Sequence, residues 1–236
     1  MPTDYVASLG AGRSASVNAV HAQILGPLRL WRDGAELNTG PRQQTYLLGL
    51  LLAREGRPTS TDELVDLIWG DEAPSSALKT LHKYVGALRR LLEPTLPARE
   101  VGSYLFRRGN GYLLTAGPNE LDLLGFRKSL AAANIELSEH RNEMALDRYV
   151  EALSFWTGPA GDGLAQGPAA MSVFAGLNDE FFDACTAAAA HAVSIGRPER
   201  VLAALHLAAT IAPLHEPVQA SLVATLGAAG RQAEAL

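Results

Sequence analysis

The chain has 236 residues, of which 47% are hydrophobic, so it is long enough for one large or two small domains that each bury a core. No apolar run reaches the roughly 20 residues that a membrane span needs, and the N-terminus lacks the basic-then-apolar order of a secretory signal. These features predict a cytoplasmic protein without a membrane partner. The single cysteine, Cys185, cannot form an internal disulfide, and its alanine-rich surroundings predict a buried, inert thiol.

Charge is distributed unevenly along the chain. The net charge is −5, but residues 23–118 carry 12 Lys and Arg against 10 Asp and Glu, whereas residues 119–236 carry 7 against 14. The contrast is sharpest in residues 75–112, where 7 basic residues stand against 2 acidic ones. A basic patch of this kind in an acidic protein is typical of nucleic-acid binding.

The N-terminal region is predicted to contain a leader and a hairpin. Residues 1–22 have no hydrophobic periodicity, so we expect them to form a disordered leader. Residues 23–38 contain Asp33-Gly34 between two short apolar runs, which predicts a β-hairpin at the start of a domain.

Helices are predicted after this hairpin. Pro41 is well placed at the first turn of a helix that runs to about Glu55. Ser60 and Glu63 form the pattern of a capping box, which predicts a short helix that stops at Gly70. The third helix is predicted within residues 75–94.

This third helix has one apolar face and one basic face. The apolar face is predicted from a stripe at spacings of three and four, formed by Leu78, Leu81, Val85, Leu88 and Leu92. At about 100° per residue, the opposite face carries Lys79, Lys83 and Arg90, with Gly86 among them. A row of cations around a residue without a side chain predicts the close approach of an anionic partner.

A basic-tipped hairpin follows the third helix. The segment "SYLFRRGNGYLL" places two β-rich runs around Asn110-Gly111, a dipeptide that satisfies both positive φ angles of a type I′ turn. Three helices and such a hairpin predict a winged helix, with the third helix offered to the major groove. Arg107 or Arg108 would reach an adjacent minor groove or its phosphates, and only one of two neighbouring strand residues can point at DNA.

A second interpretation of these features needs no ligand. Any amphipathic surface helix has a polar face that meets water, and Gly86 could simply be tolerated at a cost of about 1 kcal/mol relative to alanine. The hairpin and the local excess of basic residues favour DNA binding.

Residues 24–115 resemble a known family. The segments "LVDLIWGDEAP", "YVGALRRLLEP" and "GNGYLL" are similar to the OmpR-type winged helix of the Streptomyces antibiotic regulatory proteins (SARP), which are transcriptional activators. The resemblance implies an N-terminal β-sheet, three helices and a C-terminal hairpin. It also implies that copies bind side by side, as a dimer, on direct repeats in promoter DNA.

The resemblance implies DNA contacts at Thr80, Lys83, Arg89 and Arg90, and a phosphate contact at the helix that begins near Arg42. Relatives often place an arginine where this chain has Ala87, and sometimes a larger polar residue where it has Gly86. Base recognition by this helix is therefore expected to be reduced, or to shift to Lys79, His82 and Lys83. The complete set of candidate DNA-binding residues is Arg42, Ser76, Lys79, Thr80, His82, Lys83, Arg89, Arg90, Arg107, Arg108 and Tyr112.

The second half of the chain contains a repeat. "GRPERVL" at 196–202 returns as "GRQAEAL" at 230–236, an offset of 34 residues that is typical of tetratricopeptide (TPR) helical hairpins. This half also resembles the bacterial transcriptional activation domain of SARP proteins, with "ALSFWTGPAGDGL" matching its Trp-x-Gly-Pro turn. Because the chain stops seven residues into the repeat, we expect this domain to be truncated at its C-terminus.

The sequence lacks the patterns of an enzyme. Neither a HExxH motif nor a nucleophile elbow, a dinucleotide fingerprint or a Walker-type phosphate loop occurs. No histidine pair has the spacing of a helical metal site. We therefore predict neither catalysis nor a cofactor nor a metal. The three tryptophans, Trp31, Trp69 and Trp156, are interpreted as core or domain-packing residues.

Together these patterns predict a mainly α protein with a small β component. Its parts are a leader at 1–22, an OmpR-type winged helix at 23–118 and a TPR-like helical domain at 119–236. The predicted function is sequence-specific DNA binding with recruitment of RNA polymerase, for genes of a secondary-metabolite (antibiotic) cluster. The alternative is a helical-repeat interaction scaffold or ligand-sensing regulator, and the salt dependence of DNA binding separates the two.

Overall fold

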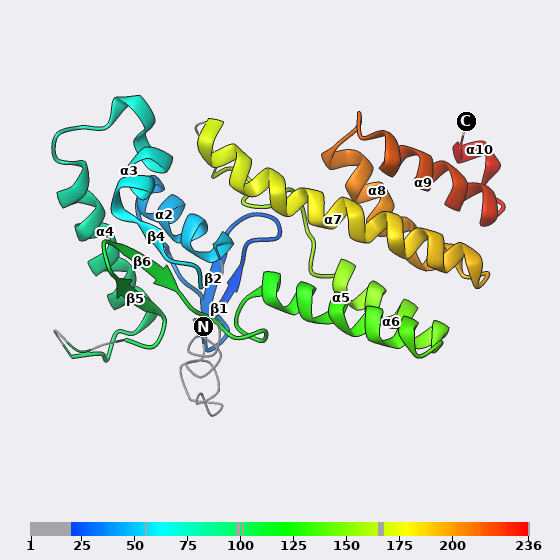
Figure 1. Cartoon of the computed structure of the whole chain (residues 1–236), viewed down its shortest axis with the longest axis horizontal. Coiled ribbons are helices and arrows are strands. Elements are labelled where there is room, and N and C mark those ends of the chain that lie inside the picture. The colour runs from blue at the N-terminus through cyan, green and yellow to red at the C-terminus, as the bar shows by residue number, and fades with distance from the viewer. Residues whose placement is uncertain (1–19, 55, 98–99, 101, 165–167, 236) are drawn as a thin grey trace. The chain divides into compact units, whose positions relative to one another are not determined.

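The computed structural model of the chain describes residues 20–54, 56–97, 100, 102–164 and 168–235 (Figure 1). Its internal contacts divide the chain into two units. The first unit comprises the described residues up to Leu124 together with those of Gly161–Phe174, and the second comprises Gly125–Ala160 and the residues from Ala175 onwards. The first unit therefore extends past the predicted boundary at residue 118 and takes in a second segment of the chain.

The first unit begins with a small antiparallel sheet. Strands β1 (Val20–Gln23), β2 (Arg29–Arg32) and β3 (Ala35–Glu36) pair in the order β1-β2-β3. The β2–β3 turn has positive φ at both Asp33 and Gly34, as the predicted hairpin requires. Strand β1 starts at Val20, so the predicted leader is too long by three residues. Residues 1–19 of that leader lie outside the described residues.

Helices α2 (Arg42–Ala53), α3 (Thr61–Trp69) and α4 (Ala77–Leu92) follow, with the 3₁₀ turn η1 (Gly70–Glu72) between the last two. The Ser60 hydroxyl accepts the Glu63 N–H at 3.1 Å, as in a capping box. The Glu63 carboxylate instead forms an ion pair with Arg54 at 2.5 Å, which joins α3 to the end of α2. Of the two hydrogen bonds of the predicted capping box, the one from the Glu63 N–H to the Ser60 hydroxyl is thus present, while the Glu63 side chain pairs with Arg54.

The core of the first unit lies between these helices and the strands. Helix α4 faces it with Ala77, Leu81, Val85, Leu88 and Leu92, all buried. The predicted stripe is therefore correct except at its first position, because Leu78 is 47% exposed and Ala77 takes the core-facing place.

A second sheet completes the winged helix. Strands β4 (Thr59–Ser60), β5 (Leu105–Arg108) and β6 (Gly111–Leu114) pair antiparallel in the order β4-β6-β5. The β5–β6 hairpin is the wing. Because β4 precedes α3 directly, pairing of β4 with β6 fixes the wing to the start of α3.

Two later segments also belong to the first unit. The buried Asp122, at the start of α5 (Asp122–Ser138), accepts the backbone N–H groups of Ile24 and Leu25 at 2.8–3.0 Å. The N–H of Gly161 donates to the carbonyl of Ile24 at 2.8 Å. These bonds explain why the first unit does not end at residue 118.

The second unit is helical. Besides most of α5, it contains α6 (Asn142–Leu153), most of α7 (Pro168–Ser194), the 3₁₀ turn η2 (Pro198–Val201), α8 (Leu202–Ile211), α9 (Glu216–Ala228) and α10 (Gln232–Ala235). Its core includes an aromatic cluster in which Trp156 stacks on Phe181 at 4.4 Å and meets Phe126 edge-on at 5.6 Å. Trp156 is thus a core residue as predicted, whereas Trp31 and Trp69 are only half-buried.

Three turns in this unit share one backbone geometry. In each, a residue with positive φ ends the helix, and the N–H of the next residue donates to the carbonyl five positions back at 2.8–2.9 Å. The positive-φ residues are His140, Gly196 and Gly230. Gly196 and Gly230 are the glycines of the two predicted repeats, so the 34-residue offset corresponds to two equivalent helix ends.

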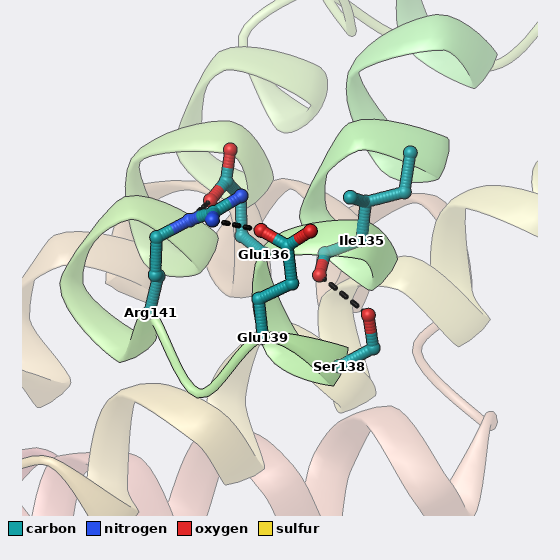
Figure 2. Close-up of polar contacts among 5 residues, drawn as sticks. All are labelled: Ile135, Glu136, Ser138, Glu139 and Arg141. Carbon is teal, nitrogen blue, oxygen red and sulfur yellow. Dashed lines mark hydrogen bonds and ion pairs between the residues drawn. The ribbon is translucent and has the colours of Figure 1, made fainter.

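The first of these turns has histidine in place of glycine. Figure 2 shows that the Arg141 guanidinium, just after His140, forms ion pairs with both Glu136 and Glu139. The Ser138 hydroxyl donates to the Ile135 carbonyl at 2.7 Å in the last turn of α5. These side-chain contacts hold a left-handed backbone that a residue with a Cβ adopts less readily than glycine.

Candidate nucleic-acid interface

The outer face of α4 is basic and open. Lys79, His82, Lys83 and Arg90 are all exposed, and the helix contains no acidic residue. The amphipathic pattern explains this arrangement, because the leucines on the opposite face anchor the helix in the core. The predicted basic face is therefore present on the surface of the first unit.

Two further predicted residues lie at the start and side of α4. Ser76 precedes the helix and is exposed, and its side chain does not cap the helix. Thr80 is half-buried one turn later. Ser76 is thus next to the exposed cations, while Thr80 is at the margin of their face.

Arg89 joins α4 to the wing. Its Nε donates to the carbonyl of Leu105 in β5 at 3.3 Å, and the side chain is half-buried. This bond sets the distance between the third helix and the wing. The sequence predicted a DNA contact for Arg89 and did not predict this internal bond.

The wing turn differs from the prediction by one residue. Arg108 pairs directly with Gly111, so the two-residue loop is Gly109–Asn110 rather than Asn110–Gly111. Gly109 has φ +54°, whereas neither Asn110 nor Gly111 has positive φ, which is the pattern of a type II′ turn.

The physical reason for this shift is the third strand of the sheet. A Cβ on Gly111 would lie 2.2 Å from the carbonyl oxygen of Thr59 in β4. Gly111 therefore serves the close pairing of β6 with β4, and Gly109 supplies the positive φ of the turn.

Both wing arginines are exposed, but they lie on opposite faces of the hairpin. Arg107 is paired with Tyr112, and Arg108 is paired with Gly111. Alternate strand residues point to opposite faces, so only one of the two arginines shares the face of Tyr112.

Tyr112 itself belongs to the core. Its side chain is 6% exposed, and its ring lies 6.3 Å from the ring of His82 on α4. A DNA contact by Tyr112 stays a prediction, and the buried ring packs between the wing and α4 beside His82.

The start of α2 adds a further basic position. Arg42 is the first residue of α2 and is exposed, and the preceding Pro41 provides no side-chain cap. The Tyr84 hydroxyl of α4 donates to the Gln43 side-chain oxygen at 3.0 Å. This bond, which sequence patterns do not reveal, ties the start of α2 to the recognition helix.

Neither the cysteine nor a group of metal-ligand side chains forms a candidate site among the described residues. Cys185 is buried, its Sγ lies 3.8 Å from the Ala204 carbonyl oxygen, and burial raises the pKa of its thiol. This agrees with the predicted inert cysteine. Among the residues that the structure describes, no three His, Cys, Asp or Glu side chains gather as metal ligands, and no helix could span a membrane.

Comparison with known proteins supports this interpretation of the two halves. Residues 35–114 match the family described as "Transcriptional regulatory protein, C terminal", and residues 121–236 match the "Bacterial transcriptional activator domain". Together these domains form the SARP arrangement. The chain belongs to the SARP family. Its similarity to SARP regulators, which are not enzymes, confirms the predicted fold class and agrees with the lack of catalytic motifs.

Individual relatives show the same relationship. The chain is 34% identical to the regulatory protein AfsR of Streptomyces coelicolor over 92% of its own length, but it spans only 21% of AfsR. It is 27% identical to the regulatory protein DnrI of Streptomyces peucetius and spans 79% of that protein and 90% of itself. A solved structure of Mycobacterium tuberculosis EmbR, in complex with a low-affinity phosphopeptide, matches 92% of the chain and 57% of EmbR with a TM-score of 0.76 and 28% identity. The SARP fold is thus shared over nearly the whole chain.

Proposed function

We propose that the chain is a sequence-specific DNA-binding transcriptional activator. The observation that carries this proposal is the exposed row of Lys79, Lys83 and Arg90 on α4, a helix without acidic residues in an otherwise acidic protein. A cationic helix face of this kind complements the phosphates and the acceptor-rich major groove of double-stranded DNA.

The surrounding elements fit the same partner. With α4 in the major groove, the wing carries Arg107 to the neighbouring backbone or minor groove. A phosphate contact at Arg42 and the first turn of α2 is part of the proposal, because the N–H groups of a helix start attract anions and Pro41 provides no side-chain cap. The Arg89–Leu105 and Tyr84–Gln43 bonds hold these elements to α4.

The acidic half is assigned to protein contacts. Residues 119–236 carry 7 Lys and Arg against 14 Asp and Glu, and this charge repels phosphate. We propose that this half contacts basic elements of the RNA polymerase holoenzyme and supports side-by-side dimers on direct repeats. We further propose that the protein acts in the cytoplasm, at the nucleoid, on promoters of a secondary-metabolite (antibiotic) gene cluster; its similarity to the Streptomyces regulatory proteins AfsR and DnrI supports a role as a regulator.

Salt-dependent DNA binding tests the proposal. The Lys83→Ala/Arg90→Ala double variant should bind promoter fragments more weakly, and its slope of log K against log salt should be flatter by about 0.9 per lost phosphate contact. Lys128→Ala, which removes an exposed lysine of α5, is the matched control and should bind as the wild type does. If the folded double variant had the same affinity and the same salt slope as the wild type, α4 would not bind in the major groove.

A further inference from the structure

Gly86 lies within the recognition helix without an internal reason for being glycine. Helix α4 continues through it, and Gly86 does not have a positive φ. Apart from its two chain neighbours and the adjoining backbone of α4, a Cβ built there would have no described heavy atom within 4 Å. Alanine would therefore fit this position in the free protein without moving any described neighbour.

Other glycines of the first unit are explained either by positive φ, as at Gly34, Gly70 and Gly109, or by crowding neighbours. A Cβ on Gly49 of α2 would lie 2.6 Å from a Leu164 methyl, and one on Gly111 would lie 2.2 Å from the Thr59 carbonyl oxygen. Glycine inside a helix disfavours folding about fivefold relative to alanine. No described residue compensates for this cost at Gly86, and the same is true of Gly176 in α7 and Gly227 in α9. Of these three, only Gly86 has a cation both three residues before it and four residues after it, so we expect a partner there.

The position of Gly86 identifies the partner. Lys83 and Arg90 are exposed and lie three residues before and four residues after it, so they flank the half-buried Gly86 on the outer face of α4. The backbone N–H and C=O at the middle of a helix are already bonded, which leaves Gly86 with only an apolar Cα to offer. In the major groove, the apolar group that projects from the bases is the thymine 5-methyl.

We propose that Gly86 is the point of closest approach between α4 and the major groove, and that it admits a thymine methyl and so determines part of the DNA sequence preference. This inference rests on the proposed function. In this inference the lack of a side chain at Gly86 determines part of the base preference, whereas Lys83 and Arg90 on either side of it contact phosphates.

Substitution by alanine should change stability and DNA affinity in opposite directions. The full-length Gly86→Ala variant should melt about 2–4 °C higher than the wild type. It should bind the preferred DNA fragment at least about fivefold more weakly, because one inserted methyl group overpacks a close interface. Gly176→Ala is the matched control, since Gly176 of α7 is also helical and has no described heavy atom within 4 Å of a Cβ. It should raise the melting temperature similarly and leave DNA binding unchanged.

Removal of a methyl from the DNA tests the chemistry directly. The probe is a fragment selected by the wild-type protein from a random pool, with each thymine replaced in turn by uracil, which lacks only the 5-methyl. At one thymine the replacement should weaken wild-type binding about fourfold, the effect of one buried methyl. In Gly86→Ala the same replacement should restore affinity, because it removes the group that the new side chain meets.

The outcomes separate this inference from the proposed function. If the wild-type protein selected no fragment from the random pool, DNA binding itself would be overturned. Unchanged affinity in Gly86→Ala would overturn the close approach while leaving DNA binding intact. Weaker binding that no uracil replacement restores would overturn the thymine assignment.

Discussion

Arg107 lies directly opposite Tyr112 across the wing, so both side chains are on the same face of the β5–β6 hairpin. Tyr112 is buried on this face, with its ring 6.3 Å from that of His82 on α4. The face that carries Arg107 is therefore the one turned towards the recognition helix. Arg108, paired with Gly111, lies on the opposite face.

This relationship predicts which wing arginine contacts DNA. Arg107→Ala should weaken binding to a promoter fragment by more than about 1 kcal/mol, because Arg107 borders the same surface as the α4 cations. Arg108→Ala should cost much less. Fluorescence anisotropy titrations of both variants against one fragment measure the difference, and the opposite ranking would place DNA on the other side of the wing.

Gly111 should be sensitive to any side chain. A Cβ there would lie 2.2 Å from the Thr59 carbonyl oxygen and 2.8 Å from its carbon, so Gly111→Ala must separate β6 from β4. We expect a loss of about 2–3 kcal/mol in the free energy of unfolding, measured by urea titration. Arg108→Ala is the control, because Arg108 pairs with Gly111 across the hairpin and its side chain is exposed. If Gly111→Ala were as stable as the control, the pairing of β4 with β6 would be too loose to explain the turn.

The wing shows why a local sequence pattern predicts the hairpin but not its register. Asn110-Gly111 is a strong turn signal, and a hairpin does form around it. The turn nevertheless falls on Gly109–Asn110, because Thr59 needs Gly111 in the strand. That requirement comes from β4, which is about 50 residues earlier in the chain, and no short-range rule includes it.

Helix boundaries and the basic face of α4 could be predicted because caps and hydrophobic periodicity are local. The limits of the first unit could not be predicted, because they depend on contacts between distant residues. The Asp122 carboxylate accepts a backbone N–H from a residue 98 positions away, and the Gly161 N–H donates to the Ile24 carbonyl. Exposure of Leu78 was missed for a related reason: the apolar spacing fits, and only packing shows that Ala77 occupies the core position.

Asp122 should make stability depend on pH. Burial raises the pKa of its carboxyl to about 6, although the N–H groups of Leu25, Ile24 and Leu123 act in the other direction. The folded state then binds the proton more tightly than the unfolded state. Protonation of Asp122 therefore stabilises the folded state. This stabilisation, about 3 kcal/mol in total, is complete below about pH 4 and is lost as the pH rises through 6.

Comparison with Asp122→Asn isolates this effect. The variant does not titrate and places an amide against N–H donors, so it should be less stable at every pH. The difference in unfolding free energy between the wild type and the variant should shrink as the pH rises from 4 to 7. Urea titrations across this range measure it. A difference that grows with pH would mean that the three N–H donors outweigh burial and lower the pKa of Asp122.

The separation of binding from activation cannot be tested by cutting the chain at the predicted boundary. A fragment ending at residue 118 would lose Asp122 and the Gly161–Phe174 segment, both of which belong to the first unit. Ile24 and Leu25 would then have buried N–H groups without partners, which is costly. Substitutions on the surface of the second unit avoid this damage.

Asp179 and Asp183 provide such a test, because they are exposed on α7 four residues apart and therefore lie on one face of the helix. If the acidic half contacts basic elements of the polymerase, Asp179→Lys/Asp183→Lys should reduce transcript yield from one promoter at saturating protein. Asp179→Asn/Asp183→Asn, which removes the charge without reversing it, should give an intermediate yield. Both variants should keep the affinity and salt slope of the wild type for the promoter, since these residues lie outside the proposed DNA face. Equal yields from all three proteins would show that this face of α7 does not carry activation.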